Sequence, residues 1–167
     1  NVKVGRWKNL AQPTADIHAV IDRVMALTDE KIRHAQIEMT LDFPPGPLVV
    51  QTAPDQLGQV FLNLVVNAVE AMGRGGSLRI EAKTVGDMIE TRFIDSGPGI
   101  PPAELPHIFE PFYTTKAEGT GLGLAISFTI IERQRGTLEV DSQLGQGTTF
   151  VVRLPKALEK QSAEETQ

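Results

Sequence analysis

The sequence predicts an α/β fold, a two-layer sandwich in which a mixed sheet of about five strands is faced by about three helices. Apolar residues recur at helical spacing in two long segments, near residues 17–27 and 54–72, and alternate with polar residues in several shorter ones. Glycine-containing turns at residues 86–87 and 145–147 join neighbouring alternating segments as hairpins. The hairpins make part of the sheet antiparallel, and we expect the helices to gather on one of its faces.

The helices are predicted from their apolar spacing and from residues at their ends. Thr14 is the expected N-cap of the first helix, whose apolar positions are Ile17, Val20, Ile21, Val24 and Leu27. Pro54 can open the second helix, because a proline in the first turn loses no helical hydrogen bond. Glycines after Met72 end that helix. A short helix is expected at residues 102–108, and a last one from about Gly121 with an apolar side formed by Leu124, Ala125, Phe128 and Ile131.

Short apolar or alternating segments predict the strands and set the boundaries of the domain. The predicted strands are residues 37–43, 48–50, 78–85, 88–94, 137–140 and 148–154. The domain itself is expected at residues 14–155. Residues 1–13 have mixed character and are predicted to be a linker, and residues 156–167 are polar and are predicted to be a disordered tail.

Composition excludes several classes of function. A chain of 167 residues with 41% hydrophobic residues suits one globular domain. Its net charge of −5 argues against a general nucleic-acid-binding surface. The sequence has no cysteine, so neither disulfides nor thiolate metal sites can form. No apolar run approaches the roughly 20 residues of a membrane span, so we expect no direct membrane contact. The chain begins with Asn1 rather than Met, as expected of a segment of a longer protein.

A polar face interrupts the apolar second helix. Gln59, Asn63 and Asn67 are spaced i, i+4 and i+8, so they share one side of that helix. A buried amide without partners costs about 1–3 kcal/mol, so other groups must satisfy these side chains. Backbone groups or water in a structural core could do so, and so could a hydrated divalent cation, for which amide oxygens are suitable hard ligands. The spacing alone leaves both possibilities open.

The segment at residues 95–99, Asp-Ser-Gly-Pro-Gly, directly follows a predicted strand. Its glycines allow a sharp turn and a close approach of the backbone to a flat ligand. Asp95 could accept a hydrogen bond from an exocyclic amine such as that of adenine. An ordinary Asp-containing β-turn would show the same pattern.

A second glycine-rich segment, residues 119–124, leads into the last predicted helix. Its glycines expose backbone N–H groups, and the helix N-terminus adds a positive dipole, which together make a cradle for phosphate. The segment lacks the Lys-Ser/Thr ending of a P-loop and does not directly follow a strand as a dinucleotide fingerprint does. Lys116 could reach the same phosphate or could be one more solvated lysine. The third segment, residues 145–150, needs no function as a hairpin turn.

Taken in this order, the segments resemble those of the catalytic ATP-binding domain of bacterial sensor histidine kinases. That domain belongs to a superfamily that also contains gyrase-like, chaperone-like and mismatch-repair ATPases. The resemblance therefore implies a Bergerat-type ATP-binding fold. The resemblance extends from Thr14 to Pro155, and it is closest in style to the nitrogen-regulation type, whose ATP lid is similarly short. The matching segments are residues 59–72 with the asparagine box, 95–100 with the first glycine box, 108–116 with the phenylalanine box, 119–124 with the second glycine box and 145–150 with the last.

The resemblance implies roles for individual residues. Asn67 resembles the Mg²⁺ ligand, and Asn63 stands where gyrase-like relatives carry a catalytic glutamate, so an amide there is kinase-like and disfavours plain ATP hydrolysis. Asp95 resembles the carboxylate that binds adenine, and Thr148 the hydroxyl that helps to hold the same base. Glu70 departs from the family, since many members carry Lys or Tyr there.

The resemblance adds a further set of residues around the nucleotide. Those expected to bind ATP are Gly97, Gly99, Ile100, Lys116, Gly119, Thr120, Gly121, Leu122, Gly123 and Leu124. Phe109 and Phe112 are expected to anchor the lid rather than to contact ATP.

The implied reaction is transfer of the γ-phosphoryl group of Mg·ATP to a histidine in two-component signalling. His18, His34 and His107 lack the sequence context of an acceptor, so we expect the acceptor on a separate dimerisation domain preceding residues 1–13. That domain is the expected direct partner and a response regulator the indirect one. The expected location is the cytoplasm, in a parent protein that is either soluble or membrane-anchored.

Two other functions remain as alternatives. The first alternative is a protein-serine kinase or an ATP-driven dimer clamp of the same superfamily. A clamp is expected to carry a glutamate at position 63 and to hydrolyse ATP without a partner. An interaction module with a degenerate nucleotide pocket is the other, and its affinity for ATP would distinguish it.

Overall fold

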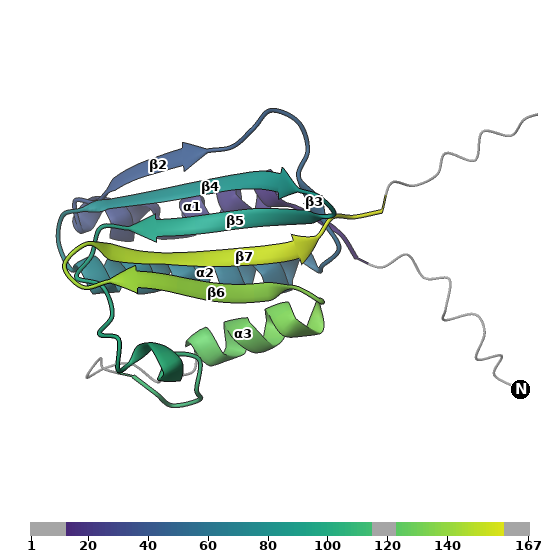
Figure 1. Cartoon of the computed structure of the whole chain (residues 1–167). Helices are drawn as coiled ribbons and strands as arrows, with labels where there is room; N and C mark the ends of the chain where they lie inside the picture. Colours follow the sequence, from purple (N-terminus) through teal and green to yellow (C-terminus); the bar gives the residue numbers. More distant parts are fainter. Residues whose placement is uncertain (1–12, 115–122, 159–167) are drawn as a thin grey trace, which may run out of the picture.

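The computed structural model describes residues 13–114 and 123–158. Five strands form one mixed sheet in the order β2-β4-β5-β7-β6. Helices α1 and α2 lie behind this sheet, and α3 lies along its β6 side (Figure 1). The predicted two-layer α/β sandwich with a mixed sheet of five strands and three helices is therefore confirmed.

The three α-helices of the described residues are α1 (Ile17–His34), α2 (Pro54–Met72) and α3 (Gly123–Arg133), and a short 3-10 helix spans Leu105–His107. The strands of the main sheet are β2 (Glu38–Asp42), β4 (Ser77–Val85), β5 (Met88–Asp95), β6 (Thr137–Gln143) and β7 (Gly147–Pro155). Two further strands, β1 (Ala15–Asp16) and β3 (Val49–Val50), pair with each other in a small sheet of their own.

The register of the sheet brings distant segments together at one end. β2 pairs with β4 in parallel, and all other neighbours in the main sheet are antiparallel. β5 and β7 pair along their whole length, which places Asp95 opposite Thr148. The turn between β6 and β7 therefore lies beside the loop that follows β5.

The core lies between the sheet and the helices. Phe61 of α2 packs on Phe93 of β5 with ring centroids 5.1 Å apart, and both side chains are fully buried. The opposite face of the sheet is polar and carries ion pairs such as Arg79–Asp42 and Arg153–Glu90. This division is the usual solution for a largely antiparallel sheet that has only one face covered.

The start of α1 differs from the prediction. The N-cap is Asp16, whose Oδ1 accepts a hydrogen bond from the backbone N–H of His18 at 3.0 Å, and not Thr14. The residues next to Thr14 pair with β3 instead, because a short strand supplies partners for their backbone groups. Leu27 is 65% exposed, so its predicted place on the apolar side is also wrong. The buried stripe continues through Thr28, whose hydroxyl donates to Val24 O at 2.8 Å.

The other boundaries show smaller differences. The segment predicted as a short helix at residues 102–108 forms only the 3-10 helix Leu105–His107, since its prolines remove donors that an α-helix needs. Beyond Pro155, the N–H of Lys156 donates to Asp87 O at 2.8 Å and that of Ala157 to Val49 O at 2.9 Å. The hydrogen-bonded structure thus reaches past the predicted end of the domain at Pro155.

Candidate functional site

Asp95 is a buried carboxylate at the end of β5. Its side chain is part of a residue only 6% exposed, and its Oδ1 accepts the backbone N–H of Gly97 at 2.9 Å and that of Thr148 at 3.3 Å. Burial raises the pKa of this carboxyl, and the two N–H bonds oppose that rise. The strand pairing and these bonds fix the carboxylate in one orientation, as expected for a group that binds an N–H donor.

The loop after Asp95 is docked on the turn between β6 and β7. The N–H of Gly145 donates to Pro98 O at 2.7 Å, and the N–H of Ile100 donates to Ser142 Oγ at 2.8 Å. Gly99 has φ +77°, and a Cβ added there would clash with Gln143 O. The close approach of the backbone at Gln143 therefore requires glycine at position 99, whether or not a ligand is bound.

Gly97 is enclosed in a similar way. A Cβ added at Gly97 would lie 3.0 Å from Asp95 Oδ1 and 3.4 Å from Met72 Cγ. The last turn of α2 thus borders the loop that carries Asp95. A side chain at position 97 would displace the carboxylate or the end of α2.

Ser142 completes the cluster, and the sequence analysis missed it. Its hydroxyl lies 2.8 Å from Thr148 Oγ1 and 3.1 Å from Gly147 O, in addition to accepting the N–H of Ile100. Ser142 pairs directly with Thr148 across the hairpin. The turn is residues 144–146, so that Gln143 pairs with Gly147, whereas the predicted turn at residues 145–147 would place Leu144 opposite Thr148. The hairpin register is thus the signal for Ser142, and it depends on the exact position of the turn.

The polar face of α2 forms a second cluster with α3. The side-chain Nδ2 of Asn63 donates to Gly123 O and to Ser127 Oγ, both at 3.2 Å, and Ser127 is fully buried. The amide N–H groups of Asn63 are therefore satisfied within the protein. Asn67 is half-buried one turn further along, and Gln59 is exposed. Asn63 links α2 to the start of α3 whatever else its oxygen binds.

The two clusters share α2 as their common support. Met72 lies nine positions after Asn63 on α2, an axial rise of about 13.5 Å, and Asn67 lies between them. Ile100 and Leu124 pack partly buried against the core, at the edges of the first and second cluster respectively. The remaining predicted residues, Lys116, Gly119, Thr120, Gly121 and Leu122, lie outside the described residues.

Of the two phenylalanines in the segment that begins at Ile108, only Phe109 packs on the core, together with Ile108 and Tyr113. Phe109 stacks on Phe128 of α3 with centroids 5.2 Å apart and meets Phe150 of β7 edge-on at 6.4 Å. Phe112 has φ +67° and is 75% exposed. The expectation of an anchor thus agrees with the packing of Phe109, whereas for Phe112 it is wrong within the described structure.

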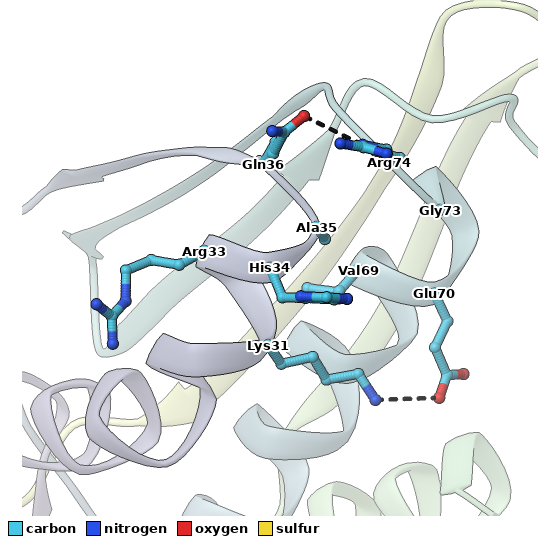
Figure 2. Close-up of a pocket in the computed structure, with 9 residues that line it drawn as sticks. All are labelled: Lys31, Arg33, His34, Ala35, Gln36, Val69, Glu70, Gly73 and Arg74. Carbon is cyan, nitrogen blue, oxygen red and sulfur yellow. Dashed lines mark hydrogen bonds and ion pairs between the residues drawn. The ribbon is translucent and has the colours of Figure 1, made fainter.

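A hollow of about 600 Å³ lies elsewhere, between the C-terminal ends of α1 and α2. Figure 2 shows Lys31 reaching from α1 to Glu70 of α2, with Nζ and Oε1 3.7 Å apart, and Arg74 donating to Gln36 at 3.1 Å. Its lining residues are Lys31, Arg33, His34, Ala35, Gln36, Val69, Glu70, Gly73 and Arg74. Basic side chains at helix C-termini offset the negative ends of the helix dipoles. This hollow therefore has an electrostatic explanation that requires no ligand.

Two negative findings apply to residues 13–114 and 123–158. No three His, Cys, Asp or Glu side chains in these ranges are grouped closely enough to hold a metal ion. Within the same ranges, every helix is too short or too polar to cross a membrane.

Comparison with known proteins agrees with this geometry. The sequence model of the family described as "Histidine kinase-, DNA gyrase B-, and HSP90-like ATPase" matches residues 52–158. Sensor histidine kinase ZraS of Escherichia coli is 38% identical over 147 residues, which cover 88% of this chain and 32% of ZraS. The chain thus spans about a third of the length of that relative.

Solved structures show the same relationship. The catalytic domain of histidine kinase ThkA superposes with a TM-score of 0.80 at 33% identity, over 88% of this chain and 97% of that domain. ThkA in complex with response regulator protein TrrA gives a TM-score of 0.75 at 31% identity, over 88% of this chain and 42% of the ThkA chain. The chain therefore belongs to the histidine kinase-, DNA gyrase B- and HSP90-like ATPase family, and its homologues are sensor histidine kinases.

Proposed function

We propose that this chain binds Mg·ATP and transfers the γ-phosphoryl group to a histidine on a separate dimerisation domain. The observation that carries the proposal is the buried carboxylate of Asp95, held by Gly97 N–H and Thr148 N–H at the end of β5. Both bonds end on Oδ1, so Oδ2 is the oxygen proposed to accept the exocyclic amine of adenine. Thr148 would hold the same base through its hydroxyl.

The phosphate end is proposed to lie along the polar face of α2. Amide oxygens suit Mg²⁺, which prefers hard oxygen ligands, and Asn67 is half-buried on that face. Bound there, Mg²⁺ would offset negative charge on the phosphates. Lys116 and the N–H groups of Gly119, Gly121 and Gly123 are proposed to hold the phosphates. Phosphoryl transfer depends mainly on such positioning and charge neutralisation.

The acceptor histidine is proposed to lie outside this chain. His18 Nε2 is 2.9 Å from Gly46 O, and His107 Nδ1 is 2.8 Å from Glu110 Oε1. His34 lines the hollow between the ends of α1 and α2. These surroundings support a structural role for the three side chains.

Partners follow from the same proposal. The dimerisation domain of the parent kinase would be the direct partner and a response regulator the indirect one, as the complex of the relative ThkA with TrrA suggests. Because ATP is the phosphodonor, the proposed location is the cytoplasm. Membership of the nitrogen-regulation type stays a prediction.

One rival function, the ATP-driven dimer clamp, is distinguished from this proposal by the residue at position 63. The Nδ2 of Asn63 donates to Gly123 O and Ser127 Oγ, and an amide cannot accept a proton from an attacking water. This supports phosphotransfer over the ATP hydrolysis expected of a dimer clamp. An interaction module with a degenerate pocket would lack measurable affinity for ATP.

The test of the metal assignment compares Asn67→Ala with Gln59→Ala, a control on the same face of α2 that is exposed. Calorimetric titration of ATP with and without Mg²⁺ should show that Asn67→Ala loses the gain in affinity due to Mg²⁺, and that Gln59→Ala keeps it. A sharp drop in melting temperature with intact Mg²⁺ dependence would show instead that Asn67 is structural.

The test of the reaction uses ATP labelled at the γ-phosphate. The full-length parent, or this chain with the parent's dimerisation helices added, should form a phosphohistidine that is labile in acid and stable in base. If neither the full-length parent nor this chain with added dimerisation helices becomes labelled, although ATP binds normally, phosphotransfer to histidine is contradicted.

A further inference from the structure

Ser142 lies at the centre of a hydrogen-bond cluster that includes Thr148. The hydroxyl oxygen of Ser142 is 2.8 Å from Ile100 N, 2.8 Å from Thr148 Oγ1 and 3.1 Å from Gly147 O. The N–H of Ile100 can only donate. The single proton of Ser142 must therefore go either to Gly147 O or to Thr148 Oγ1.

These two positions of one proton give Thr148 opposite polarities. When Ser142 donates to Gly147 O, Thr148 can donate its own proton to Ser142 and presents only lone pairs to a ligand. When Ser142 donates to Thr148 Oγ1, the proton of Thr148 is available to a ligand. Ser142 thus controls whether Thr148 acts as an acceptor or a donor.

Adenine requires the second arrangement. Its edge carries an exocyclic amine, a donor, next to ring atom N1, an acceptor. Asp95 accepts from the amine under the proposed function, so a neighbouring group that bonds directly to N1 must donate. Asp95 and Thr148 are opposite each other in the β5–β7 pairing, and the N–H of Thr148 donates to Asp95 Oδ1 at 3.3 Å, so the two residues are direct neighbours at this end of the sheet.

We infer that Ser142 is a positioning and specificity-determining residue, which orients the hydroxyl of Thr148 as a donor toward N1 of an adenine nucleotide. The inference rests on the proposed function. Ser142 acts through Thr148 and does not itself contact the base. Its bond with Ile100 also holds the loop after Asp95 against β6, and that second effect does not depend on which base is bound.

The experiment separates these two effects with a nucleotide that lacks N1. In 1-deaza-ATP the ring nitrogen is replaced by C–H, so no donor is needed there. Calorimetric affinities for ATP and 1-deaza-ATP are compared in the wild type and in Ser142→Ala. We expect Ser142→Ala to weaken ATP binding by about 3- to 10-fold, the range for one neutral hydrogen bond, and to weaken 1-deaza-ATP binding by at least 3-fold less.

Matched variants serve as controls. Ser142→Thr keeps the hydroxyl and should bind ATP within about 2-fold of the wild type. Thr137→Ala removes an exposed hydroxyl from the other end of β6 and should change neither affinity. In a Thr148→Val background, Ser142→Ala should affect both nucleotides by the same factor, because the group that it orients is gone.

The outcomes distinguish the inference from the proposed function. Equal weakening of ATP and 1-deaza-ATP by Ser142→Ala would overturn the inference and leave Ser142 as a structural residue. A wild type that binds neither nucleotide would overturn the proposed function itself. Partial unfolding of Ser142→Ala would lower both affinities equally, so the ratio between the two nucleotides remains informative.

Discussion

At the scale of single residues, the molecule places one carboxylate where ionisation is costly. Asp95 is buried, and burial raises its pKa above the ordinary value of 3.8 while Gly97 and Thr148 N–H groups oppose the rise. A folded-state pKa above the unfolded value means that the carboxyl binds its proton more tightly in the folded protein than in the unfolded chain. Its contribution to stability is present below pH 3.8 and is lost as the pH rises through the raised pKa. A ligand amine would recover that loss, because it binds the ionised form.

Asp95→Asn tests this assignment. The variant should bind ATP more weakly by about 1–3 kcal/mol, the cost of a hydrogen bond to a charged group. GTP should bind the wild type poorly, because its ring carbonyl would face the carboxylate. Because the pKa of Asp95 lies above 3.8, ATP binding by the wild type should weaken before the falling pH reaches 3.8. Asp95→Asn should show no such weakening. Calorimetry at several pH values gives both profiles, and protonation of ATP itself cancels in their ratio. Parallel profiles, or equal affinities for ATP and GTP, would exclude Asp95 as the adenine-binding group.

At the scale of elements, the parts with clear local signals were predicted well. The bounds of α2 agree with the prediction because Pro54 and the glycines after Met72 mark its ends. The β4–β5 hairpin agrees because Gly86 and Asp87 form its turn. β1 was not predicted because a strand of only two residues shows no alternating pattern, and only its pairing with β3 defines it as a strand. In the candidate site, Ser142 was missed for the same reason, since its role follows from the β6–β7 register.

The contact between α2 and α3 gives a prediction at this scale. Asn63→Asp keeps the shape of the side chain but replaces the amide donor, which faces Gly123 O and Ser127 Oγ, with an acceptor. We expect the free energy of unfolding to fall by about 1–3 kcal/mol, because the partly buried carbonyl of Gly123 loses its donor and faces a negative charge. Urea denaturation measures the change. The control is Gln59→Glu on the exposed part of the same face, which should stay within about 0.5 kcal/mol of the wild type. Equal effects of the two changes would show that Asn63 does not hold α3.

The outer face of the sheet gives a second prediction, for Glu90. Burial raises the pKa of Glu90, but hydrogen bonds from Arg92 at 2.6 Å and Arg153 at 2.9 Å outweigh it, so the pKa lies below 4.5. Such a group stabilises the fold above pH 4.5, and the contribution is lost as the pH falls through the lowered pKa. Glu90→Gln should therefore reduce the free energy of unfolding by about 1–3 kcal/mol at pH 7, and the difference should shrink below pH 4.5.

Denaturant titrations at several pH values measure this difference. Glu81→Gln is the matched control, since Glu81 pairs with Arg79 at 3.2 Å on the same face but is far more exposed. An exposed pair of this kind contributes at most about 1 kcal/mol. A difference for Glu90→Gln that is the same at pH 7 and at low pH would show that packing, and not ionisation, explains its effect.

At the scale of the whole molecule, the strand order separates the candidate site from the ends of the described chain. The end of β5, the β6–β7 turn and the start of α3 lie at one end of the sheet, and β1, β3 and the end of β7 lie at the other (Figure 1). The bridge between Val50 and Lys156 places the chain after β7 beside β3, which also pairs with β1. A domain attached through residue 13 would thus join the sandwich away from the proposed nucleotide site.

Because the site is built from α2, α3 and three strands of one core, nucleotide binding should stabilise the whole fold. A ligand that binds only the folded state adds about 2.7 kcal/mol at a free concentration of 100 times its Kd. For a domain of this size each kcal/mol raises the melting temperature by roughly 2–4 °C, so Mg·ATP should raise it by about 5–11 °C. GTP at the same concentration should raise it far less.

Scanning calorimetry measures both shifts in melting temperature, with the ATP concentration checked before and after. Equal shifts for ATP and GTP would contradict base selection by Asp95, and no shift with either would favour an interaction module. Loss of ATP during incubation without a partner would favour a hydrolysing clamp.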